Sequence, residues 1–166
     1  MTKTVRGLAF AGVAVAMLWA GGAWAQGGAT FELISPAEAR QAAKAELEAP
    51  EEIRPRQVIP RGSVPAIRVV SPNALGAAVA APVRIELAFA PKPGTRIVPS
   101  SFRVLYGLLK IDLTERLRKH ATVTEDGVVV DRANVPDGQH RLILQVADDQ
   151  GNTGEQELLI RVGAAS

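Results

Sequence analysis

The 166-residue sequence predicts an all-β sandwich of about seven strands, and three observations predict it. From residue 66 onward, short segments alternate apolar and polar residues and are separated by Gly, Pro, Asp and Asn, which is typical of sandwich strands and their turns. No cysteine is present, so an apolar core rather than disulfides has to stabilise the fold. The roughly 100 residues of this region are enough to enclose one core.

The first 25 residues have the order of a cleavable secretory signal peptide. Lys3 and Arg6 give a basic start, an apolar run covers residues 8–20, and the small residues of the segment 23–25 precede a cleavage site before Gln26. This apolar run is shorter than the ~20 residues that a membrane-spanning helix needs. We therefore expect an exported protein, periplasmic or extracellular, with no transmembrane span once the leader is removed.

Removal of the leader changes the charge of the protein. The leader holds 2 of the 19 basic residues and none of the 17 acidic ones, so 17 of each remain. A neutral chain lacks the broad basic surface that nucleic acid requires, so we expect no nucleic-acid partner. The aromatic residues that remain are Phe31, Phe89, Phe102 and Tyr106, too few for the stacking surfaces that bind sugars or single strands.

A helix is predicted over about residues 36–48. Ser35 is a good N-cap, Pro36 fits the first helical position, and Glu38 can complete a capping box. The segment is rich in Ala, and Leu47 is its only bulky apolar residue, so helix propensity rather than core burial favours it. We expect a marginal helix on an arm that contributes nothing to the core.

Residues 49–65 form a predicted linker. Pro50, Pro55, Pro60 and Pro65 recur at five-residue intervals, and prolines at this density favour extended chain. The predicted organisation is a signal peptide (1–25), an N-terminal arm (26–65) and a sandwich (66–166).

The predicted strands follow in chain order. In the clearest of them, residues 83–89, Val83, Ile85, Leu87 and Phe89 point to one face. Asp148 to Asn152 has the composition of a tight turn and predicts a hairpin between the last two strands. The seven expected strands lie near residues 67–70, 83–89, 102–106, 111, 128–130, 140–146 and 158–162.

The segment 135–142, followed by Asp148 and by Gly151-Asn152, resembles the last two strands of bacterial immunoglobulin-like and fibronectin-like extracellular domains. This resemblance implies an immunoglobulin-like β-sandwich over residues 66–163. His140 stands where those domains commonly carry Tyr.

Residues 71–89 are also similar to the periplasmic copper-resistance family, another immunoglobulin-like sandwich. That family binds copper through an amino-terminal His and a His near the final hairpin. Here the expected mature start is Gln26, and the hairpin carries Asp148, Asp149 and Asn152 instead. We expect these three to serve the turn, with calcium as the alternative, although calcium takes six to eight oxygen ligands.

The candidate chemistry of the chain is sparse. His140 lies on the apolar face of a strand, where a hydrogen-bonded histidine is expected, and His120 lies in a polar stretch typical of the surface. No phosphate loop, Gly-x-Ser-x-Gly or metalloprotease motif occurs. We therefore predict no catalytic residues, no bound metal, no cofactor and no enzymatic activity.

The least regular segment covers residues 106–117. One interpretation is a middle strand with a bulge at Gly107, whose side chains face both sheets. The other is an exposed edge or loop that binds a partner. The candidate contact residues are Tyr106, Leu108, Leu109, Lys110, Arg116 and Arg118.

Together these observations favour an exported, non-enzymatic binding or structural module whose partner is another envelope protein. The alternative is a periplasmic accessory protein that binds a small ligand or a metal.

Overall fold

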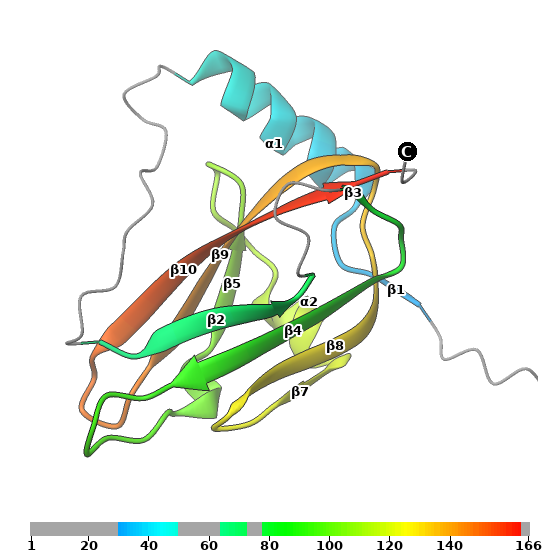
Figure 1. The fold of residues 1–166 in the computed structure, drawn as a ribbon. Helices are drawn as coiled ribbons and strands as arrows, with labels where there is room; N and C mark the ends of the chain where they lie inside the picture. Colours follow the sequence, from blue (N-terminus) through cyan, green and yellow to red (C-terminus); the bar gives the residue numbers. More distant parts are fainter. Residues whose placement is uncertain (1–29, 50–63, 73–77, 164–166) are drawn as a thin grey trace, which may run out of the picture.

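The computed structural model describes residues 30–49, 64–72 and 78–163, which form two five-stranded sheets packed face to face, with one helix across an end (Figure 1). The elements are β1 (Phe31–Glu32), α1 (Pro36–Glu48), β2 (Ala66–Ser71), β3 (Ala78–Val79), β4 (Val83–Ala90), β5 (Arg103–Tyr106), β6 (Ile111–Asp112), α2 (Thr114–Arg118), β7 (Ala121–Val123), β8 (Gly127–Asn134), β9 (Gly138–Ala147) and β10 (Thr153–Val162). The predicted leader and the linker residues 50–63 lie outside the described residues.

One sheet has the order β1-β8-β4-β2, with β7 also paired to β8, and the other has the order β3-β10-β9-β5-β6. Both sheets are mixed, because β1 is parallel to β8 and β3 is parallel to β10. All seven expected strands are present, and β1, β3 and β7 bring the total to ten. The prediction of an all-β sandwich is confirmed at this level.

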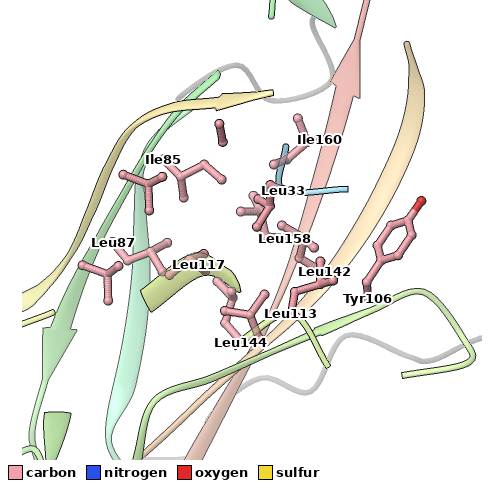
Figure 2. Packing of buried hydrophobic residues seen from close by; sticks show 14 of the residues in the cluster. Leu33, Ile85, Leu87, Tyr106, Leu113, Leu117, Leu142, Leu144, Leu158 and Ile160 are labelled. Carbon is pink, nitrogen blue, oxygen red and sulfur yellow. The ribbon is translucent and has the colours of Figure 1, made fainter. Parts of the chain in front are cut away.

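Alternation along the strands builds the core. In β4 every second side chain, from Val83 to Phe89, is buried, as the sequence predicts. The long hairpin of β9 and β10 is antiparallel over its full length, so Leu142 lies opposite Leu158 on the inner face. Figure 2 shows side chains of both sheets meeting in this core, with Leu33 among them.

The N-terminal segment corrects one expectation. Phe31, Leu33, Ile34 and Ala42 are buried in the core, so the prediction that the arm contributes nothing to it is wrong for these residues. The predicted helix is confirmed as α1, with its Ser35–Glu38 capping box. The apolar group of residues 31–34 is too short to show a period, and therefore its burial gave no sequence signal.

The segment 106–117 is not a bulged middle strand, the first of the two interpretations that the sequence allowed. Strand β5 ends at Tyr106, and a turn follows in which Gly107 (φ 64°) and Lys110 (φ 51°) have left-handed backbone conformations. After β6, Leu113 and Leu117 are both buried, and the amide of Leu117 donates to the carbonyl of Leu113. This i,i+4 spacing is helical, and it places α2 inside the segment that the first interpretation treated as a single strand.

Candidate functional site

The carboxylate of Glu38 both caps helix α1 and binds it to the sandwich. Glu38 Oε2 accepts hydrogen bonds from the Ser35 amide and hydroxyl (both 2.8 Å), which completes the cap of the helix. The same carboxylate receives both terminal nitrogens of Arg116, from α2, at 2.8 and 3.0 Å. The Arg116 bonds are the main cause that lowers the pKa of Glu38 to about 2, while partial burial opposes the shift.

The inner face of α1 lies directly on the turn after β5. A Cβ placed on Gly107 would stand 3.0 Å from Cβ of Ala42, so a side chain in the turn would be tight beneath the helix and would require Ala42 to shift by a few tenths of an ångström. The φ of Gly107, 64°, also favours glycine there. A space lies beside the C-terminal half of α1.

That space is a groove of about 480 Å³ between α1, the β5–β6 turn and the start of β9. Its lining residues are Ala43, Glu46, Leu47, Leu108, Gln139 and Arg141. Of the lining residues, Leu47 is 87 % exposed, and Leu109, which follows the lining residue Leu108 in the turn, is 48 % exposed. We define these two side chains, together with Leu108, as the apolar rim.

Arg141 supplies the charge in the groove. Its Nε lies 3.6 Å from a Glu46 oxygen and 3.4 Å from a Glu157 oxygen, so two carboxylates flank one guanidinium. Among the described residues, Nε and Nη1 of Arg141 are buried without a hydrogen-bond acceptor. The groove thus combines an apolar rim with a partly buried ionic cluster.

A buried polar pair lies close to the groove. Tyr106 Oη and His140 Nδ1 are 2.9 Å apart, and His140 Nε2 lies 2.8 Å from the Pro136 carbonyl. A carbonyl only accepts, so Nε2 carries a proton and, in the neutral ring, Nδ1 accepts from the tyrosine hydroxyl. Burial lowers the pKa of His140 and raises that of Tyr106 to about 12, and Glu46 supports the tyrosine shift. The expected hydrogen-bonded histidine is confirmed.

The six predicted contact residues do not form one surface. Tyr106 is 2 % exposed, and therefore it cannot contact a partner. Leu108 lines the groove, while Leu109 and Lys110 are exposed on the adjoining turn. Arg116 and Arg118 are used within the fold, Arg116 by Glu38 and Arg118 by the carbonyls of Ser100 and Phe102.

Sequence reasoning missed the groove residues that α1 and β9 supply. Leu47 did carry a signal, because it is the only bulky apolar side chain of an otherwise Ala-rich helix. Gln139 and Arg141 carried none, since their strand has ordinary alternation and only the packing of α1 places them beside the helix.

The hairpin after β9 is confirmed as a turn. Asp148 accepts hydrogen bonds from the amides of Gln150 and Asn152 and from the side chain of Asn152. Burial of Asp148 opposes ionisation, but these bonds lower its pKa overall. His120 is exposed as predicted, and its ring stacks on Phe31 with centroids 4.2 Å apart.

Among residues 30–49, 64–72 and 78–163, no group of three or more His, Cys, Asp or Glu is placed to hold a metal ion. Neither α1 nor α2, the helices of that same part, is long and apolar enough to cross a membrane. No protein-family model matches the chain, and no curated protein matches it.

Proposed function

We propose that the protein is an exported, non-enzymatic binding or structural module of the cell envelope, built on an immunoglobulin-like sandwich. Strand order supports this type of sandwich. The order β2-β4-β8-β7 in one sheet and β5-β9-β10 in the other corresponds to the ABED and CFG sheets of immunoglobulin domains. The basic, apolar and small-residue order of residues 1–25 supports export.

His140 gives further support to the immunoglobulin-like type. In the tyrosine corner of such domains, a Tyr near the start of strand F bonds to the backbone a few residues upstream. His140 lies near the start of β9, and its Nε2 bonds to the carbonyl of Pro136, four residues upstream. The histidine thus makes the bond that the tyrosine would make.

The observation that carries the binding role is the apolar rim. Single exposed apolar side chains are ordinary, but Leu47 and Leu108 line one groove from separate elements, and Leu109, next to Leu108 in the turn, is exposed as well. Burying them against a partner would remove apolar area from water at about 25 cal/mol per Å². We propose that another envelope protein covers this rim, with Lys110 at its edge.

The proposal is tested in intact cells with a photo-crosslinking amino acid in place of Leu47 or Leu109. Val70, on β2 of the other sheet, is 46 % exposed and is the matched control position. We expect one discrete crosslinked species from positions 47 and 109, reduced by Lys110→Glu, and none from position 70. Arg116 is unsuitable for charge reversal because it holds Glu38. Equal labelling at all three positions, or no crosslink at 47 and 109, contradicts the proposed binding surface.

A further inference from the structure

Residues 30–49 form a segment that packs on the sandwich through hydrogen bonds, ion pairs and buried side chains, as a bound peptide would. Its strand β1 pairs in parallel with β8, Phe31 beside Ala133 and Glu32 beside Asn134. The amide of Leu33 then donates to the carbonyl of Asn134 at 3.0 Å. Leu33 and the adjacent Ile34 are fully buried, so this end of the segment fills part of the core.

Polar contacts hold the rest of the segment. Arg116 donates to the Leu33 carbonyl at 2.9 Å as well as to Glu38. A single arginine therefore binds both the residue after β1 and the first turn of α1. Farther along α1, Ala42 lies on Gly107 and Glu46 approaches Arg141. The surface that receives the segment, which we call the acceptor surface, is therefore built from β8, α2, the β5–β6 turn and β9.

All contacts between the segment and the acceptor surface are non-covalent, and the chain rejoins the described fold only at Val64. The intervening residues 50–63 include Pro50, Pro55 and Pro60. Fourteen residues of any chain span at most about 50 Å, because a fully extended chain covers about 3.3–3.6 Å per residue. We propose that the acceptor surface also takes residues 30–49 of a second copy, so that two chains exchange their segments reciprocally.

A second copy is the occupant to which the structure points, because the acceptor surface already fits this one segment. Its apolar pair, its capped helix and its Glu38 carboxylate each meet a counterpart there. Reciprocal exchange creates two identical interfaces and closes the dimer. Docking within one chain competes with exchange, since joining the segment and the acceptor surface in one chain raises their effective concentration. Exchange should therefore become visible when docking within the chain is blocked.

Charge reversal blocks docking within the chain and permits it between chains. One variant carries Glu38→Arg and the other carries Arg116→Glu, so each chain alone opposes like charges at this contact. When the two are mixed, the segment with arginine at 38 meets glutamate at 116, and the second interface keeps the wild-type pair. We expect a one-to-one complex of twice the monomer mass by native mass spectrometry on mixing, absent from either variant alone.

The matched control is the single chain that carries both reversals. It restores an opposite-charge pair within the chain, lacks the capping box just as the Glu38→Arg chain does, and should remain monomeric. If this control folds while the mixture, co-refolded from denaturant, gives no complex, the exchange is refuted.

A cysteine pair tests the same exchange without altering Glu38 or Arg116. Wild-type chains have no cysteine, and the exposed residues Glu32 and Asn134 are aligned partners of β1 and β8. One chain carries Glu32→Cys, a second carries Asn134→Cys, and a chain with both shows that the bridge can form. Under mild oxidation of the mixture, the disulfide between unlike chains should exceed those between like chains several-fold. A statistical mixture of the three dimers refutes the exchange.

Discussion

At the scale of single residues, Glu38 performs two tasks that proteins usually give to different side chains. It closes the N-terminus of α1 through Ser35 and anchors the helix to α2 through Arg116. One negative charge therefore contributes both to the end of the helix and to its position on the sandwich. Loss of that charge weakens both the helix cap and the docking contact.

We predict that Glu38→Gln lowers the free energy of unfolding at neutral pH by about 1–2 kcal/mol. This figure is below that of a buried pair because 41 % of the Arg116 side chain is exposed. The pKa of Glu38 is about 2 in the folded protein and ordinarily 4.5. Its contribution is therefore complete above pH 4.5 and is lost as the pH falls toward 2. Urea unfolding across this range measures the effect, and a variant with the same acid dependence as wild type contradicts it.

Replacement of His140 by Phe should leave the Tyr106 hydroxyl and the Pro136 carbonyl without their partners. We expect a loss of about 1–3 kcal/mol for each buried group left unpaired. Tyr106→Phe is the matched control, since it removes only the tyrosine hydroxyl. A double-mutant cycle by chemical denaturation gives the coupling energy, and purely additive losses would mean that the two rings do not interact.

The depressed pKa of His140 also gives wild-type stability a pH dependence. A buried imidazole that resists protonation contributes fully above its ordinary pKa of 6.5, and this contribution is lost as the pH falls through the lower folded value. The thermal midpoint of wild type should therefore decline on acidification below 6.5. In His140→Phe this part of the decline should be missing; a decline equal to that of wild type contradicts the assignment.

At the scale of elements, the sequence predicted those whose pattern is local. Strand β4 is identified by its alternation, and α1 by Ser35, Pro36 and Glu38. Strands β1 and β3 have two residues each, and they exist only through pairing with β8 and β10, which no local pattern reveals. The groove was missed for the same reason, because α1 and β9 meet only through tertiary packing.

Gly154 provides a test of how closely the two sheets approach at the start of β10. A Cβ added there would lie 1.8 Å from the carbonyl oxygen of Pro65, just before β2. Gly154→Ala should therefore destabilise the protein by about 1–3 kcal/mol. Gly163→Ala is the control, because a Cβ at that position has nothing within 4 Å. If the two variants unfold at the same denaturant concentration, the close contact is wrong.

At the scale of the whole molecule, the aromatic residues report on processing. Both tryptophans, Trp19 and Trp24, belong to the predicted leader, and Tyr106 is the single tyrosine. We expect the exported protein to emit only tyrosine fluorescence, while the unprocessed precursor also shows tryptophan emission. Mass spectrometry of the secreted form, with a mass beginning at Gln26, is the direct check. Tryptophan emission from the secreted form would place cleavage elsewhere.

The parallel pairing of β1 with β8 also has a consequence for the order of folding. The two strands are about a hundred residues apart, and contacts of such separation form late because a long loop has to close first. During synthesis, Leu33 and Ile34 therefore leave the ribosome long before the strand that covers them. In pulsed hydrogen exchange during refolding, the Leu33 amide should gain protection after the amides of β9 and β10, and earlier protection would contradict this order. Until β1 pairs with β8, Leu33 and Ile34 stay exposed to chaperones and proteases, although they are synthesised first.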